Sequence, residues 1–258
     1  MNTADVITQD AFLDGRVMVL QPKSAYRAGL DAVLLAATVP ASGANDSPPK
    51  VLDLGAGVGT VGLCVAARID VVDVVLLERE PALAALARQN ITQNGMGARI
   101  RVVEADLTVS ADALALASDS FDYCLANPPF QVEGHGRPST DPLKARAHAM
   151  PEGDLDRWVR TMVRLAKPGG VATMIHRADA LAEILAAFQT RFGAVAVLPL
   201  FARDGDEAVR VLVSGVKGSR APLRILPGLV LHRADSQAFT PRLQAILRDG
   251  APLDMSAR

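Results

Sequence analysis

Residues 51–63 read VLDLGAGVGTVGL, an apolar run that passes into a glycine-rich stretch. The aliphatic residues at its start indicate a buried strand, and those that follow position 59 indicate a helix. Gly55, Gly57 and Gly59 lie between the two and let the backbone turn tightly and approach a ligand closely. Because the N-terminus of the helix follows at once, the stretch predicts an α/β fold with a ligand-binding loop.

The alternation of strands and helices continues toward the C-terminus. Apolar strands separated by helices are typical of a parallel sheet that is covered on both faces. Only FARDGDE separates the last two strands, which is too short for a parallel crossover, so we expect an antiparallel pair at one end of the sheet. The expected strands are 51–55, 71–78, 99–105, 121–126, 170–176, 194–200 and 208–217. The expected helices lie near 59–68, 81–94, 111–117, 154–167 and 178–191.

A smaller unit precedes the sheet. FLDGRVMVL (12–20) predicts a hairpin that turns at Asp14-Gly15, and AGLDAVLLAATV (28–39) predicts a helix. The segment PASGANDSPP (40–49) has the composition of a linker. We therefore expect an N-terminal hairpin and helix over residues 1–49.

Another small unit follows the sheet domain of residues 50–217. SRAPLRILPGLVLH (219–232) suggests two short strands. A last helix is expected with Thr240 as its N-cap and Pro241 at its first position, ending near Gly250. Residues 218–258 then form an addition to the same globular unit.

Composition narrows the class of protein. The 258 residues are half hydrophobic and carry a formal net charge of −1, so any surface for nucleic acid must be local. Cys64 and Cys124 lie in apolar segments and read as buried free thiols of a reducing compartment. The N-terminus does not resemble a secretory signal, and no apolar run reaches the ~18 residues of a membrane span. These features predict a soluble, cytoplasmic protein without membrane contact.

Polar side chains lie in or just after four of the expected strands. Asp53 lies in the first, two residues before the first loop glycine, Glu78 ends the second, Asp106 follows the third and Asn127 follows the fourth. The carboxyl ends of parallel strands meet along one edge of a sheet, where doubly wound folds bind their ligands. A carboxylate about 20 residues after the glycine loop, as Glu78 is, suits the hydroxyl groups of a ribose. The four side chains are expected to share one crevice.

These residues are compatible with two nucleotide ligands, NAD and S-adenosylmethionine. Gly57, Gly59 and Gly62 satisfy the dinucleotide pattern G-x-G-x-x-G, which favours NAD, although a purely structural turn can carry the same glycines. Asp53 lies two residues before the first loop glycine, where its charge would repel a pyrophosphate. The same charge would attract the ammonium group of S-adenosylmethionine, which is therefore the preferred cofactor.

VLDLGAGVGTVGL, LLERE, EADL and NPPF together resemble the successive motifs of class I S-adenosylmethionine-dependent methyltransferases. The resemblance implies a seven-stranded Rossmann-like sheet, mostly parallel with one antiparallel strand and with helices on both faces. It also implies that Asp53 and the loop from Gly55 to Gly59 hold the methionine end of the cofactor. Glu78, with Arg79 beside it, would contact the ribose. Asp106 and the backbone of Leu107 would contact the adenine.

The motif NPPF (127–130) matches [DNS]-P-P-[YFW], which is similar to the signature of enzymes that methylate a planar nitrogen. Such a nitrogen is a poor nucleophile because its lone pair is delocalised. The Asn127 side-chain oxygen and the Pro128 carbonyl are the predicted acceptors for its N–H groups. Pro129 stiffens the corner beside the substrate, and Phe130 offers a face for stacking, worth about 1–3 kcal/mol for a base.

Two further segments resemble bacterial tRNA (adenine-N6) methyltransferases that act on valine tRNA. QPKSAYRAGLDAVLLAA (21–37) resembles a segment that closes over the cofactor, which makes Tyr26, Arg27 and Asp31 candidate contacts. The alternative is a helix cap and a core helix. KARAHAM (144–150) resembles a basic and aromatic substrate segment with Lys144, Arg146 and His148, the histidine standing where a tyrosine is more usual.

The resemblance predicts an RNA adenine-N6 methyltransferase acting on tRNA. A protein glutamine methyltransferase, a small-molecule methyltransferase and a nucleotide-binding module without catalysis remain alternatives. The four histidines lack ligand spacing, so we expect no metal site. Basic residues that could contact RNA phosphates are Lys144, Arg146, Arg157, Arg160, Arg164, Lys217, Arg220 and Arg224.

Overall fold

The structure is a computed structural model, and it describes residues 7–23, 27–41, 47–107, 116–129, 131–132, 149–150 and 154–256. Residues 131–132 (β7, Gln131–Val132) and 149–150 (β8, Ala149–Met150) are described by their backbone, which forms a short parallel pair. Among the described residues, no helix is both long and apolar enough to cross a membrane. Both cysteines are buried free thiols, as predicted.

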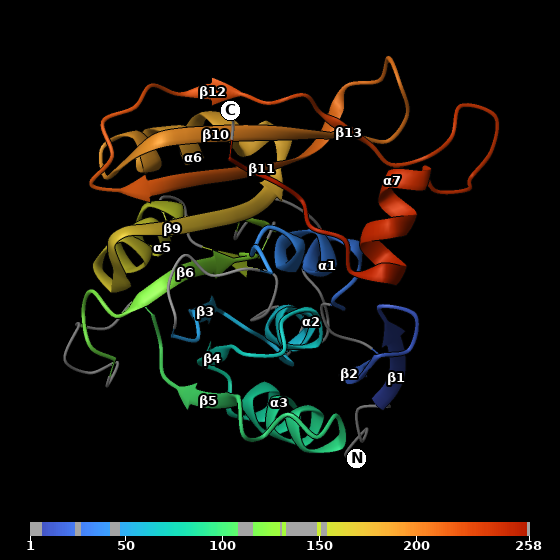
Figure 1. Ribbon diagram of the computed structural model, residues 1–258, viewed down its shortest axis with the longest axis vertical. Coiled ribbons are helices and arrows are strands. Elements are labelled where there is room, and N and C mark those ends of the chain that lie inside the picture. The colour runs from blue at the N-terminus through green and yellow to red at the C-terminus, as the bar shows by residue number, and fades with distance from the viewer. Residues whose placement is uncertain are drawn as a thin grey trace.

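A mostly parallel sheet occupies the centre of the molecule (Figure 1). Its main strands lie in the order β10-β11-β9-β6-β3-β4-β5, and β11 alone among these seven runs opposite to the other six. The strands are β3 (Lys50–Leu54), β4 (Asp73–Glu78), β5 (Ile100–Glu104), β6 (Phe121–Ala126), β9 (Ala166–Arg177), β10 (Phe192–Phe201) and β11 (Ala208–Lys217). The predicted sheet, with one antiparallel strand, is confirmed.

The strand order places the ligand crevice. From β3 the chain continues outward through β4 to β5, and then returns to the other side of β3 for β6 and β9. A crevice forms at such a switch point, outside the carboxyl ends of the strands on either side of it. The ends of β3, β4, β5 and β6, which carry the predicted polar side chains, therefore meet at the carboxyl edge of the sheet.

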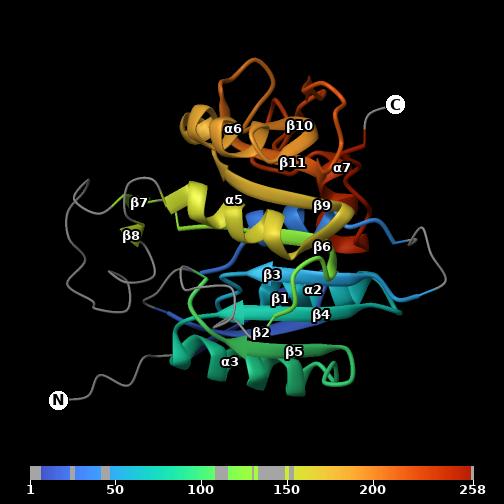
Figure 2. The same cartoon turned by 90° about the vertical axis from the view of Figure 1, so that its left-hand side faces the viewer.

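Helices cover both faces of the sheet (Figures 1 and 2). Leu34, Leu63 and Leu76 belong to the core on one face, whereas Leu52, Trp158 and Phe188 belong to the core on the other. The helix predicted near 111–117 lies mostly outside the described residues. The first face carries α1 (Leu30–Ala37), α2 (Thr60–Arg68) and α3 (Pro81–Gln93), and the second carries α5 (Asp154–Leu165) and α6 (Leu181–Gln189), which follows a 3-10 turn, η2 (Ala178–Ala180).

The N-terminal hairpin is attached to α3 by asparagine side chains. Strands β1 (Ile7–Phe12) and β2 (Val17–Pro22) pair antiparallel around the predicted Asp14-Gly15 turn. The Asn90 side chain accepts from the Leu20 N–H at 2.7 Å and donates to the Leu20 carbonyl at 2.9 Å. The Asn94 side chain likewise accepts from the Met18 N–H at 2.9 Å and donates to the Met18 carbonyl at 2.7 Å. Residues four apart on a helix rise by about 6 Å, close to the ~6.7 Å between alternate strand residues. The two amides thus act as a partner strand for β2.

Asn90 should therefore be a large contributor to stability. It is fully buried, and its amide also donates to the carbonyl of Val58 in the glycine loop, at 3.0 Å. Asn90→Leu leaves three backbone groups without this partner, the buried carbonyl of Val58 and the part-buried amide and carbonyl of Leu20. A buried group left unsatisfied costs about 1–3 kcal/mol. We expect urea denaturation to show a loss of roughly 3 kcal/mol or more. Asn94→Leu, at a half-buried position, is the control and should lose about 1 kcal/mol; equal losses would contradict the buried-amide explanation.

The C-terminal segment packs onto the α1 face. Strands β12 (Arg224–Ile225) and β13 (Leu229–Val230) extend the sheet beyond β10. Thr240 caps α7 (Pro241–Gln244) by accepting from the Leu243 N–H, as predicted, and a π-helical turn, η3 (Ala245–Asp249), leads to Gly250. The Leu253 N–H donates to the Ala37 carbonyl at 2.8 Å. The segment thus holds the C-terminal end of α1 in place.

Candidate active site

Glu78 organises the glycine loop at the carboxyl edge. One of its carboxylate oxygens accepts from the Gly57 N–H and the other from the Glu80 N–H, both at 2.8 Å. The Ala56 N–H donates to the Leu77 carbonyl at 3.0 Å, so the loop continues the sheet before it turns into α2. Each carboxylate oxygen has a second lone pair, which leaves Glu78 able to accept from the two hydroxyls of a ribose.

Gly55 is required by close packing as well as by its backbone. Its φ of +62° lies in the left-handed region, and a Cβ at this position would lie 2.3 Å from Cη2 of Trp158. Trp158 comes from α5 on the opposite face, is 7% exposed and supports the loop from below. A larger residue at position 55 would displace either the indole or the loop.

Asp53 is buried beneath the loop at the end of β3. It is 1% exposed, and one of its carboxylate oxygens accepts from the Gly62 N–H at 3.2 Å. Burial raises the pKa of Asp53 to about 8, against the opposing effect of the Gly62 hydrogen bond, and the neighbouring Glu78 carboxylate adds to the rise. An acid in such a place is stabilised in its ionised form by a cation.

Glu78 is itself buried, with 6% of its surface exposed. Burial raises its pKa, while hydrogen bonds from the backbone of Glu80, Gly57 and Arg79 lower it. Two adjacent buried carboxylates favour a ligand that carries positive charge and hydroxyl groups. They disfavour a pyrophosphate, as expected for Asp53 from the sequence.

Asp106 and Leu107 follow β5 at the same edge. The carbonyl of Leu107 accepts from the Thr161 hydroxyl of α5 at 3.2 Å, which anchors the turn after the strand. Asp106 is half-buried beside it. Both residues are placed where they could contact the adenine of a nucleotide. That contact remains a prediction.

The Asn-Pro-Pro corner follows β6, next to the glycine loop of β3. Asn127 and Pro129 are half-buried and Pro128 is buried, whereas Phe130 lies outside the described residues. Behind the corner, the His176 ring is 4% exposed and lies close to the Pro129 backbone. Burial lowers the pKa of His176, and the Pro129 contact opposes that change. The ring is therefore a neutral support for the corner.

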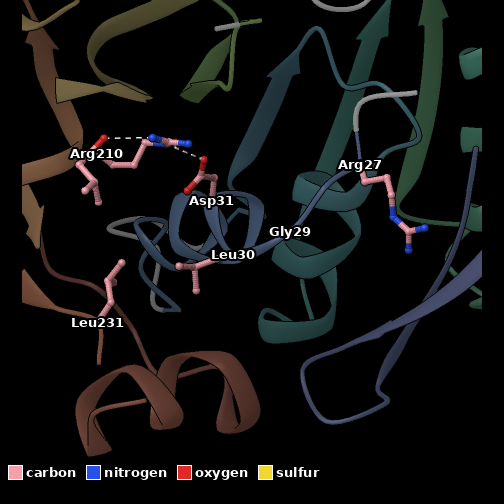
Figure 3. Close-up of a pocket in the computed structure, with 7 residues that line it drawn as sticks. Arg27, Gly29, Leu30, Asp31, Arg210 and Leu231 are labelled. Atoms are coloured by element: carbon pink, nitrogen blue, oxygen red, sulfur yellow. Dashed lines mark hydrogen bonds and ion pairs between the residues drawn. The ribbon is translucent and has the colours of Figure 1, made fainter. Parts of the chain in front are cut away.

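The first turn of α1 and the residues before it bridge the hairpin and the sheet. Arg27 pairs with Asp10 of β1 at 2.6 Å, and Asp31 pairs with Arg210 of β11 at 3.1 Å. Both Arg27 and Asp31 line a cleft of about 420 Å³ at the carboxyl edge (Figure 3). Tyr26 lies outside the described residues. The cofactor contacts predicted for this segment remain predictions.

The basic residues predicted to contact RNA phosphates are spread over the fold: Arg157, Arg160 and Arg164 lie on α5, and Arg220 and Arg224 follow β11. Lys144, Arg146 and His148 lie outside the described residues. Lys217 lies at the far end of the antiparallel β11, at the edge opposite the crevice, where it pairs with Asp119 and donates to the Ala166 carbonyl. The reversed direction of β11 carries Lys217 away from the crevice. Its contact with an RNA phosphate stays a prediction and would lie outside this site.

Three residues of the site were not predicted from the sequence: Trp158, His176 and Arg210. Each comes from an element distant in sequence from the motif that it supports. Trp158 lies in a strongly amphipathic helix, where an indole usually belongs to the core. His176 ends an apolar strand, which is the one signal that could have placed it at the carboxyl edge.

Comparisons with known proteins agree with this geometry. A family model described as Methyltransferase small domain matches residues 28–151, which hold the glycine loop, the edge carboxylates and the Asn-Pro-Pro corner. A crystal structure of a predicted O-methyltransferase from Agrobacterium tumefaciens superposes with a TM-score of 0.73 and 34% identity, covering 88% of this chain and all of that one. The chain belongs to the class I methyltransferases.

Two relatives carry the same name, tRNA1(Val) (adenine(37)-N6)-methyltransferase. The protein from Bacteroides thetaiotaomicron is 27% identical to this methyltransferase over 198 residues, which are 76% of this chain and 79% of the relative. The protein from Escherichia coli is 32% identical over 135 residues, which are 51% of each chain.

A methyl group added at Gly57 should obstruct the cofactor without disturbing the fold. Gly57 has a φ of +57° and nothing within 4 Å of a built Cβ, and Gly95, after α3, has a φ of +66° and the same open surroundings. Each glycine-to-alanine change should cost about 1–2 kcal/mol of stability. Gly57→Ala should weaken S-adenosylmethionine binding at least tenfold by calorimetry, and Gly95→Ala should not. Equal affinities would contradict the placement of the cofactor over the loop.

Proposed function

We propose that this methyltransferase uses S-adenosylmethionine to methylate N6 of an adenine in tRNA. The observation that carries the proposal is the position of the Asn-Pro-Pro corner, which follows β6 directly beside β3 and its glycine loop. A methyl donor over β3 and β4 and an acceptor at the end of β6 would then meet above neighbouring strands. The proposed tRNA substrate implies a cytoplasmic enzyme.

The residues of the crevice fit the proposed cofactor. Asp53 offers a buried carboxylate for the positively charged methionine end, and Glu78 offers unused lone pairs for the ribose. Asp106 and Leu107 would contact the adenine. When bound, S-adenosylmethionine supplies a methyl group that is activated by its sulfonium.

The corner supplies the chemistry on the acceptor side. An exocyclic amine on a purine has a delocalised lone pair, and its two N–H groups require acceptors in fixed positions. The Asn127 side-chain oxygen and the Pro128 carbonyl would accept these hydrogens and localise the lone pair toward the methyl donor. Acceptors fixed before the reaction stabilise the positive charge that develops on the nitrogen, and the proton that the methylated nitrogen loses leaves to water.

A nitrogen acceptor is favoured over the oxygen acceptor that is ascribed to the Agrobacterium tumefaciens relative. Histidine is the commonest general base for an oxygen nucleophile, and His176 is the described histidine beside the corner. That ring is buried rather than exposed to the crevice. The two relatives named as adenine-N6 methyltransferases support the same choice.

Nucleoside mass spectrometry of tRNA tests the proposal. Total tRNA from a strain that lacks the protein should show a loss of N6-methyladenosine, and the purified enzyme with S-adenosylmethionine should restore it. A strain that expresses Asn127→Ala serves as the control for secondary effects of the deletion. Unchanged tRNA together with methylation of a peptide glutamine, or of a small molecule, would replace the tRNA assignment by one of those acceptors.

A further inference from the structure

The cleft beside α1 lies on the acceptor side of the active site. Its walls are Leu30 with the backbone of Gly29, Val209 and Arg210 at the start of β11, and Leu231 after β13. In Figure 3, Arg210 and Asp31 point toward one another above Leu30 and Leu231, while Arg27 extends away toward β1. The cleft holds about 420 Å³.

Sheet register places this cleft near the Asn-Pro-Pro corner. β6 pairs with β9, and β9 pairs with β11 through Arg177 and Arg210, so the cleft lies two strands beyond the corner at the same edge. Neighbouring strands are about 4.8 Å apart, and Arg210 lies two residues beyond the level of Asn127, which together give a separation of about 12 Å. The cofactor loop is on the other side of β6. The cleft is therefore next to the acceptor and remote from the adenine end of the donor.

The charges and walls of the cleft suit an uncharged ring better than a phosphate. Arg210 is paired with Asp31, and Arg27 is paired with Asp10, so both arginines already have carboxylate partners. The turn between β10 and β11 adds Asp204, Asp206 and Glu207 against a single arginine, Arg203, and this excess would repel a phosphate. Leu30, Val209 and Leu231 give the cleft apolar sides.

A nucleobase matches all of these properties. Single-stranded RNA is recognised by splaying its bases into apolar pockets, stacking them and binding their edges. The Asp31 carboxylate offers acceptors and the Arg210 guanidinium offers donors at one end of the cleft, which is complementary to a base edge that carries both kinds of group. We propose that the cleft receives the base of the nucleotide adjacent to the methylated adenine. The inference rests on the proposed function, since it requires an RNA substrate.

Val209 allows the cleft to be filled without disturbing the core. It is 41% exposed on the cleft wall, and tryptophan is well accepted in strands. Val71 is the matched control, because it is 64% exposed and precedes β4 at the opposite edge of the sheet. The substrates are three anticodon stem-loop RNAs that contain adenine 37, the position in the name of the two relatives. One RNA is intact, and two carry an abasic nucleotide on the 5′ or on the 3′ side of that adenine.

For the wild type, one of the two abasic substitutions should lower kcat/KM roughly tenfold, the loss expected for one stacked base. Val209→Trp should show the same loss on intact RNA. It should lose little more on that abasic RNA, because the substitution and the missing base remove the same contact. Val71→Trp should behave as the wild type. Emission of 2-aminopurine at the same position should change on binding to the wild type and not to Val209→Trp.

Two results would overturn the inference while leaving the proposed function intact. One is a wild-type enzyme that methylates all three RNAs equally well. The other is a Val209→Trp variant that matches the wild type on intact RNA. A wild type that methylates none of the RNAs, yet methylates another acceptor, would instead overturn the proposed function and the base-binding cleft with it.

Discussion

Asn127→Ala should abolish most methyl transfer while leaving the cofactor bound. The alanine removes a predicted acceptor for the target amine, and loss of one fixed dipole at a reacting centre typically costs on the order of 10²–10³ in rate. We expect single-turnover methylation of tRNA to slow by that factor. The dissociation constant of S-adenosylmethionine, measured by calorimetry, should change no more than about threefold. The split between rate and affinity distinguishes an acceptor of substrate hydrogens from a cofactor ligand.

Asn127→Asp is the informative companion variant. Aspartate keeps an oxygen acceptor at the position and occurs in the [DNS]-P-P-[YFW] pattern, so it should retain part of the rate that alanine loses. An Asn127→Ala enzyme whose cofactor affinity fell as far as its rate would assign Asn127 to the donor side. A variant with an unchanged rate would remove the catalytic role of the corner altogether.

The edge residues of the site could be predicted because parallel strands impose a simple geometry. Once β3, β4, β5 and β6 are recognised as parallel, Asp53, Glu78, Asp106 and Asn127 must project from the same edge. Strand direction also explains why Lys217 lies at the opposite edge of the sheet. Its strand was correctly expected to be antiparallel, and that direction alone carries its far end to the opposite edge.

Side chains that act through tertiary contacts could not be predicted in this way. Nothing near Gly55 in the sequence indicates that Trp158 packs beneath it, because the contact joins opposite faces of the sheet. The pair between Asp31 and Arg210 joins residues 179 positions apart. In the sequence, Asn90 looks like an ordinary polar residue of a helix. Its buried amide is explained only by the free edge of β2, whose Leu20 backbone it hydrogen-bonds.

Asp53 gives the folded protein a distinctive dependence on pH. Its pKa is raised to about 8 in the folded state, from an ordinary value of 3.8. Between these values the folded protein keeps a proton that the unfolded chain has released, so the free energy of unfolding falls as pH rises through this window. Asp53→Asn cannot ionise, and it should lose this part of the slope. We expect the melting temperatures of variant and wild type to diverge from pH 5 to pH 9, with the variant relatively more stable at the alkaline end.

The same carboxylate should couple cofactor binding to proton release. A cationic ligand favours ionised Asp53, so below pH 8 binding must displace the proton, and affinity for S-adenosylmethionine should rise between pH 6 and pH 8. Asp53→Asn lacks a charged acceptor, which is worth about 1.5–3 kcal/mol, and should bind roughly 10- to 100-fold more weakly at pH 8. The pH dependence of the affinity of Asp53→Asn reports the titration of the ligand itself.

Calorimetry in buffers of different ionisation enthalpy measures the proton released by the wild type at pH 7. A wild type that releases no more protons than Asp53→Asn, and binds with the same pH profile, would place the positive charge of the cofactor elsewhere in the crevice.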